Sequence, residues 1–167
     1  WIPRENISPA HSVVVKLGQS IFTPGNPSNQ DLILNDRPYA GLLYIGISLN
    51  QRHNLPQINL EVLDTREITL GIIGPWSLAK EVQDAAHDLL GDKRFRGWAH
   101  QLHNEPAVQL AMEKKFKHYR GSETITLGFS ADFIRSIGLR FGNIETSANI
   151  SIENRIGWNL PNDFGSF

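Results

Sequence analysis

The sequence contains no cysteine and only one methionine among its 167 residues. The absence of cysteine excludes disulfide bonds, thiolate metal sites and a cysteine nucleophile, and it leaves the cellular compartment open. An excess of charge of one sign is also missing, since the net charge is -1 and the pI is near 6.7. We therefore expect no nucleic-acid partner, because no bulk positive field would attract one.

Long apolar runs are missing too. No segment approaches the roughly 18 apolar residues of a membrane-spanning helix, and the mean hydropathy is -0.28. Such values usually indicate a soluble protein, but a transmembrane β-barrel alternates lipid-facing and lumen-facing residues and keeps its mean hydropathy low. The sequence starts at Trp1 without a Met or a signal peptide, so we expect a processed product or a fragment.

What is present is a repeated alternation of apolar and polar residues. In the stretch 41–51, for example, Leu43, Ile45 and Ile47 share one face, whereas glycine and polar residues occupy most of the other. A period of two residues is typical of a β-strand with two different faces. The pattern predicts six or seven strands, over residues 12–22, 41–51, 57–73, 106–118, 125–141 and 148–160.

The lengths of the strands and connections bear on the fold class. A soluble β-sandwich binding protein also alternates, with its polar residues facing water. However, several strands are longer than usual, and short connections (52–56 and 119–122) alternate with long ones (23–37 and 74–105). That alternation is typical of outer-membrane barrels. We therefore expect an all-β fold, part of an antiparallel up-and-down transmembrane β-barrel, with residues 1–167 in a single domain.

One short helix is expected in an outer loop, over residues 78–90, with Ser77 as its N-cap and Gly91 at its end. Gln83 and His87 are four residues apart and share one face. In a soluble protein the opposite, apolar stripe would pack inward and His87 would meet water. At a membrane rim the stripe would face lipid and the polar pair would face the barrel wall. The stripe consists of Leu78, Val82, Ala85 and Leu89.

Strand order places this helix beside a second polar segment. Residues 36–41 open one predicted strand, a hairpin follows, and the loop with the helix comes after it. In an up-and-down barrel both segments then lie at the same outer rim. A neutral His87 there can act as a general base near pH 7, and Gln83 can orient it or a water molecule.

Several motifs occur in an order that resembles the lipid A 3'-O-deacylase family. The resemblance extends over nearly the whole chain, and it depends on the joint order of the motifs. They are Asn35-Asp36-Arg37-Pro38-Tyr39-Ala40-Gly41, Gly74-Pro75, Gln83-x-x-x-His87, Gly97-Trp98, Gln101-Leu102, Asn104-Glu105-Pro106 and Asn159-Leu160-Pro161-Asn162-Asp163-Phe164-Gly165.

The resemblance implies a bacterial outer-membrane enzyme that hydrolyses the 3'-linked acyloxyacyl ester of lipid A, with Ca²⁺ as cofactor. Its partners would be lipopolysaccharide and outer-membrane lipid, and we expect a monomer. The family's catalytic His matches His87, its helix Gln matches Gln83, and its basic elbow residue matches Arg37. His87 would activate water, while calcium and the basic side chain would stabilise the oxyanion. We assign Asp36 and Tyr39 to substrate binding, although Asp36 could instead cap its loop.

The chain departs from the family pattern at its start. Family members carry an earlier segment with an Asn-Asp pair and a Thr that help to build the calcium site, and no counterpart precedes Trp1. We therefore expect the metal ligands mainly in that segment and leave them unassigned. The closing strands of a family barrel also have no counterpart. A non-catalytic outer-membrane barrel, serving as a channel or scaffold, remains an alternative.

Other charged residues suggest weaker sites. Lys114, Lys115 and Lys117 lie beside a predicted short turn, and we interpret them as a solvated strand end. His100 and His103 lie three residues apart near an acidic residue, but nothing in the pattern brings further ligands together. We therefore interpret both histidines as solvated loop residues.

Overall fold

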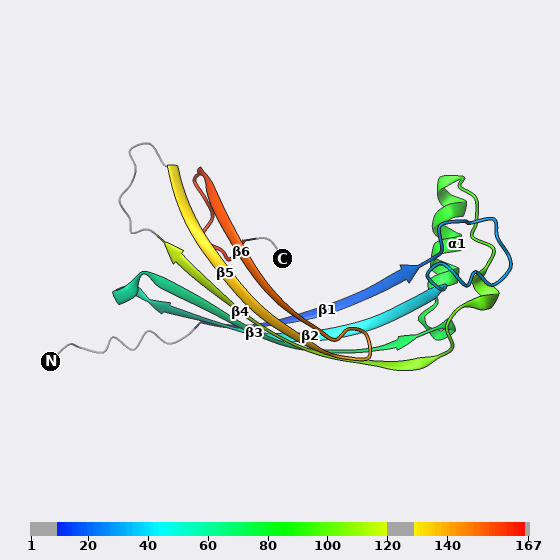
Figure 1. The fold of residues 1–167 in the computed structure, drawn as a ribbon, viewed down its shortest axis with the longest axis horizontal. Coiled ribbons are helices and arrows are strands. Elements are labelled where there is room, and N and C mark those ends of the chain that lie inside the picture. Colours follow the sequence, from blue (N-terminus) through cyan, green and yellow to red (C-terminus); the bar gives the residue numbers. More distant parts are fainter. Residues whose placement is uncertain (1–9, 120–128, 166–167) are drawn as a thin grey trace.

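The computed structural model describes residues 10–119 and 129–165. They form a curved antiparallel sheet of six strands in sequence order, with one helix standing at one end (Figure 1). The helix, α1, spans Ala79–Leu90. Short 3₁₀ turns cover Pro56–Ile58, Pro75–Ser77 and Trp98–His100. The strands are β1 (Ala10–Phe22), β2 (Ala40–Leu55), β3 (Leu60–Ile73), β4 (Glu105–Tyr119), β5 (Phe129–Gly142) and β6 (Ser147–Trp158).

The strand register places apolar residues together on one face and polar residues on the other. One cross-strand row on the outer face joins Ile47, Ile68, Leu110 and Phe141, all of which are exposed. The inner face carries polar residues that are buried, including Ser48, Thr69, Gln109 and Ser136. A soluble sandwich would cover the apolar face with a second sheet. In the described part of the chain that face is the exposed one, so the sandwich alternative is wrong.

The structure also revises several predicted boundaries. β2 continues through the predicted turn 52–56, because it pairs with β3 as far as Leu55↔Leu60. The turn is made by the following 3₁₀ segment and by Asn59, which has a φ of 49°. The strand predicted over 125–141 is described from Phe129 as β5, and residues 125–128 lie outside the described part. No helix in the described ranges is long and apolar enough to cross a membrane.

The predicted helix is confirmed, but its predicted N-cap is wrong. Ser77 belongs to the preceding 3₁₀ turn, where its Oγ donates to the carbonyl oxygen of Gly74 at 2.6 Å. The N-cap position is occupied by Leu78, which has a φ of 58° and no side-chain cap. Pro75 explains the difference, because it starts the turn that uses the serine hydroxyl. At the other end Gly91, with a φ of 73°, closes the helix as predicted.

Two glycines bring α1 onto the sheet. A Cβ atom on Gly41 would overlap the side chains of Ser77 and Ala79, so only glycine lets the first helical turn reach the start of β2. Gly74 has a φ of 95°, and its N–H donates to the carbonyl oxygen of Gly41 at 2.9 Å. The helix is therefore fixed directly beside the elbow that opens β2.

The lysines at the end of β4 are not a solvated strand end. Lys115 and Lys117 lie on the inner face and are buried, and only Lys114 is exposed. Lys117 pairs with Glu61 of β3 at 3.2 Å. The interpretation from the sequence is wrong for these two residues because a segment far along the chain, which includes Asp163 and Phe164, covers the inner face there.

Candidate functional site

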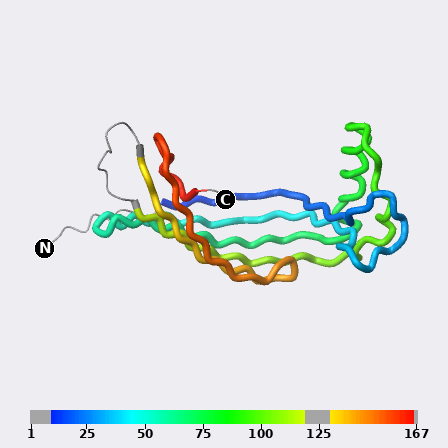
Figure 2. Tube along the Cα trace, turned by 45° about the horizontal axis from the view of Figure 1, so that its top comes forward, coloured from blue at the N-terminus to red at the C-terminus, as the bar shows by residue number. Residues whose placement is uncertain are grey.

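The candidate site lies at the end of the sheet where the long connections meet. Figure 2 shows α1 and the loops before β2 and β4 gathered at this end, away from the β2–β3 turn. Hydrogen bonds connect these loops: the N–H of Arg96 donates to the carbonyl oxygen of Pro27 at 3.0 Å, and the N–H of Leu102 donates to that of Tyr39 at the same distance. The predicted placement of the elbow and the helix on one rim is therefore confirmed.

His87, in the last turn of α1, is held by the chain that follows the helix. Its Nδ1 lies 2.6 Å from the carbonyl oxygen of Lys93. Because a carbonyl oxygen can only accept, Nδ1 carries a proton. In the neutral ring Nε2 then holds a free lone pair. The imidazole also packs edge-on against Phe95, with ring centroids 5.6 Å apart.

Gln83 lies one helical turn before His87 and contacts the same loop. Its Oε1 accepts a hydrogen bond of 2.9 Å from the indole Nε1 of Trp98, a residue that is only 2% exposed. An indole N–H can only donate, so the contact fixes the orientation of the amide. The NH₂ group of Gln83 is left as a donor on its other side.

An aromatic cluster joins these helix residues to the elbow. Tyr39 is buried and packs against Trp98, at 5.1 Å between ring centroids, and against Phe95, at 6.4 Å. The Tyr39 hydroxyl accepts the N–H of Gly97 at 3.4 Å. Ala79 and Ile21 complete the cluster. Tyr39 thus supports the residues around His87, and its predicted contact with substrate stays a prediction.

The apolar stripe of α1 points away from the protein. Leu78, Val82 and Leu89 are exposed, and Leu89 has 87% of its surface accessible. Gln83 and His87 are partly buried on the opposite side. This is the orientation expected at a membrane rim, and the orientation expected in a soluble protein is wrong.

Asp36 and Arg37 lie just before Tyr39 at the elbow, and both are exposed. The Asp36 carboxylate accepts the N–H groups of Gly25 at 2.8 Å and Arg37 at 2.7 Å. These two backbone donors hold its pKa below the usual value. Asp36 therefore closes the 23–37 loop. The structure brings His87, Gln83 and Tyr39 into one cluster and leaves the carboxylate of Asp36 engaged in its own loop.

The pattern in the sequence did not reveal the pair that braces His87. Asp88 follows His87, Arg94 follows Lys93, and the two side chains form a two-pronged ion pair across Gly91, with Nε 2.7 Å from Oδ1. The guanidinium lowers the pKa of Asp88, and the carboxylate raises that of Arg94. One signal in the sequence could have predicted this ion pair: two opposite charges lie six residues apart, on either side of the glycine that ends the helix.

The predicted calcium ligands stay unassigned. No group of three or more His, Asp or Glu side chains converges in ranges 10–119 and 129–165. Asp84 has one buried carboxylate oxygen without a partner, but its other oxygen accepts Lys80 Nζ at 2.7 Å, and a single carboxylate does not make a calcium site. His100 and His103 are exposed, in agreement with their interpretation as loop residues.

Comparisons with known proteins agree with this geometry. The comparison with curated protein sequences gave no match. Among solved structures, LpxR from Salmonella typhimurium matches with a TM-score of 0.67 and 22% sequence identity, over 80% of this chain and 43% of that one. The chain therefore spans less than half of that protein's length, and the likeness shows a shared fold. The model of the family described as outer membrane protein LpxR matches residues 3–167. That match covers nearly the whole sequence, and the chain belongs to the LpxR family of outer-membrane proteins.

Proposed function

We propose that the protein is a lipid A deacylase of the outer membrane, which hydrolyses the 3'-linked acyloxyacyl ester with His87 as the general base. The observation that carries the proposal is the hydrogen bond between His87 Nδ1 and the Lys93 carbonyl oxygen. It leaves Nε2 as the proton acceptor, which is the form that a general base requires. Family membership supports the substrate class, and lipopolysaccharide and outer-membrane lipid are the proposed partners.

The reaction would proceed in two steps. Nε2 of His87 takes a proton from water, and the water oxygen bonds to the ester carbonyl carbon. The resulting imidazolium keeps its Nδ1–H bond to the carbonyl oxygen of Lys93. When the tetrahedral intermediate collapses, the bond from carbon to the alcohol oxygen breaks, and Nε2–H returns the proton to that oxygen.

Two residues could support the developing oxyanion. The NH₂ group of Gln83 is free to donate because Trp98 occupies its Oε1. The guanidinium of Arg37 lies on the elbow, two residues before Tyr39, and is always protonated. Removing one donor to an oxyanion commonly costs about 3 kcal/mol in transition-state stabilisation. All the residues assigned here come from one chain, and we propose that the enzyme acts as a monomer.

Calcium is part of the proposal through the family resemblance alone. Because no group of three or more His, Asp or Glu side chains converges in the described residues, no step above depends on the ion. We expect chelation with EDTA to abolish deacylation and calcium, but not magnesium, to restore it. Full activity after exhaustive chelation would contradict the calcium requirement while leaving the role of His87 untouched.

The test of the proposed function is analysis of lipid A by mass spectrometry. The protein would be produced in the outer membrane of a strain whose lipid A is fully acylated. We expect loss of the 3'-linked acyloxyacyl group with the native sequence and its retention with His87→Ala. The matched control is His103→Ala, which removes an exposed histidine from the neighbouring loop. Unchanged lipid A with the native sequence would point to a non-catalytic barrel.

A further inference from the structure

The segment after β6 folds back over the inner face of the sheet. Residues 159–165, called the strap below, begin and end at positions of positive φ, 49° at Asn159 and 76° at Gly165. Figure 1 shows this part of the chain, in red, leaving the end of β6 and returning over the sheet. The sequence indicated only that these residues form a family signature, and the proposed reaction makes no use of them.

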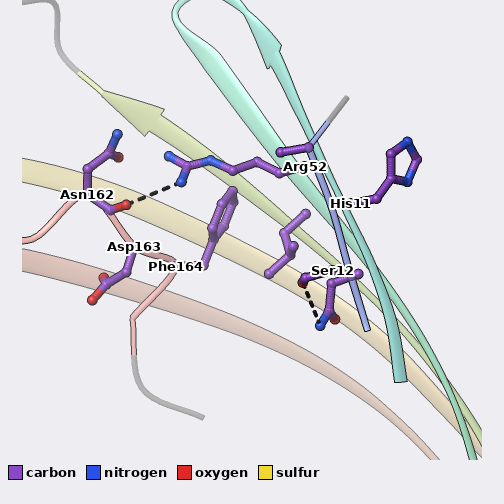
Figure 3. A pocket seen from close by; sticks show the side chains of 9 residues that line it. His11, Ser12, Arg52, Asn162, Asp163 and Phe164 are labelled. Carbon is purple, nitrogen blue, oxygen red and sulfur yellow. Dashed lines mark hydrogen bonds between the residues drawn. The ribbon is translucent and has the colours of Figure 1, made fainter. Parts of the chain in front are cut away.

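Basic side chains from two strands donate to the strap. Lys117 Nζ of β4 donates to the carbonyl oxygen of Asp163 at 2.9 Å and to the Asn162 amide oxygen. Arg52 of β2 donates to the carbonyl oxygen of Asn162 at 3.4 Å, and Figure 3 shows this contact beside the ring of Phe164. Lys115 Nζ lies 3.5 Å from the carbonyl oxygen of Phe164. The strap therefore spans the inner face from β2 to β4.

Phe164 anchors the strap between these cations. It is 5% exposed, its ring centroid lies 5.5 Å from Arg52 Cζ, and Lys117 Nζ lies 5.4 Å from it. Cations at this distance from an aromatic ring are attracted by its electron density, most strongly where water is excluded. Glu61 pairs with both cations, at 2.8 and 3.2 Å, and balances part of their charge.

The far side of the strap is tied to β6 and β5. The guanidinium of Arg155 forms ion pairs with Asp163 of the strap and with Asp132 of β5. The same Asp163 carboxylate accepts the N–H of Gly165 at 3.1 Å. In all these contacts the strands supply the cations. The strap supplies the groups that attract them: carbonyl oxygens, an amide oxygen, a carboxylate and a ring face.

These contacts lie at the end of the sheet opposite α1. Arg52 and Glu61 flank the β2–β3 turn, and Lys117 is two residues from the end of β4. A cavity of about 280 Å³ separates part of the strap from β1–β3, and it is lined by Asn162, Asp163 and Phe164 on the strap side and by residues such as His11 and Leu63 on the other. The strap thus crosses the inner face of the sheet at this end.

We propose that the strap is a built-in plug, which closes the lumen at the end opposite α1 and makes the protein non-conducting to ions. An outer-membrane sheet cannot leave open edges in lipid, so its polar inner face lines a closed lumen. Without the strap that wall would present Arg52, Lys117 and Arg155 to water and would leave an aqueous path. With the strap, each of these cations contacts an acceptor on Asn162 or Asp163.

The experiment is ion conductance of the protein, purified from outer membranes and reconstituted in planar lipid bilayers containing KCl. We expect no conductance steps with the native sequence. The double variant Asp163→Ala/Phe164→Ala removes the carboxylate and the ring, and we expect discrete openings. The matched control Arg140→Ala breaks an exposed inner-wall ion pair with Glu145 at the other end of the sheet, and it should remain silent.

Correct folding of each variant is checked by its heat-modifiable migration on gels. If the double variant does not fold, Lys117→Met keeps the aliphatic stem, removes the two hydrogen bonds from Lys117 to the strap, and should also give discrete openings. Steady conductance of the native protein, or a folded strap variant that stays silent, would overturn the proposal. Because no strap residue contacts His87, this result is independent of the proposed deacylase activity.

Discussion

The two ends of the sheet are stabilised by different interactions. At the α1 end, aromatic packing and neutral hydrogen bonds hold His87 with Nε2 unused, and the apolar stripe of the helix is exposed. At the strap end Lys117 and Glu61 are buried, Arg155 is partly buried, and each of the three has an ion-pair partner. A reactive group needs an unsatisfied atom, whereas a buried charge is tolerated only when it is satisfied. This contrast supports the proposed chemistry at the α1 end and the proposed closure at the strap end.

The largest effect is expected from His87→Ala. General-base catalysis contributes about 10²–10⁴-fold to a rate, so deacylation should fall by that factor. The folded fraction, read from heat-modifiable migration, should not change, because the side chain makes one hydrogen bond and one ring contact. A loss of folding with this variant would mean that the α1 end is structural and would break the comparison.

Lys117→Ala should give the opposite result. The substitution removes a buried cation that pairs with Glu61 and donates to the strap, and it leaves Glu61 with Arg52 as its remaining partner, so the free energy of unfolding should fall by about 3 kcal/mol. Urea unfolding in detergent, followed by tryptophan fluorescence, measures the change. Arg140→Ala, which breaks an exposed pair with Glu145, is the control and should cost less than about 1 kcal/mol. Deacylation by the folded Lys117→Ala protein should remain near the native level.

The sequence predicts the elements at the α1 end better than the contacts at the strap end, and the reason is physical. Strands and helix follow from local periodicity, and strand order alone places the elbow and Gln83/His87 on one rim. The carbonyl oxygen of Lys93 has no sequence signature, because any residue supplies one. The strap contacts of Arg52, Lys115 and Lys117 join residues 45 or more positions apart, such as Lys117 and Asn162. Alternation indicates that Lys117 faces inward, but only this distant contact buries it.

A smaller effect is expected from Trp98→Phe, which sharpens the role of the aromatic cluster. Phenylalanine keeps the packing against Tyr39 but removes the indole donor to Gln83. One neutral hydrogen bond is worth about 1 kcal/mol, so deacylation should fall by about fivefold. Trp76→Phe, at an exposed position outside the cluster, is the control and should be neutral. A fall in kcat without a change in KM would show that Gln83 acts on the transition state.

The smallest effect concerns pH at the strap end. The Arg155 guanidinium and the N–H of Gly165 hold the pKa of Asp163 below its usual value of 3.8. Because the folded-state pKa is the lower one, the contribution of Asp163 is fully present above the unfolded value and is lost as pH falls through the folded value. Acidification below pH 4 should therefore lower the unfolding midpoint of the native protein more than that of Asp163→Asn. Parallel curves for the two proteins would show that this carboxylate does not hold the strap, and the contrast with the α1 end would then depend on Lys117 and Phe164.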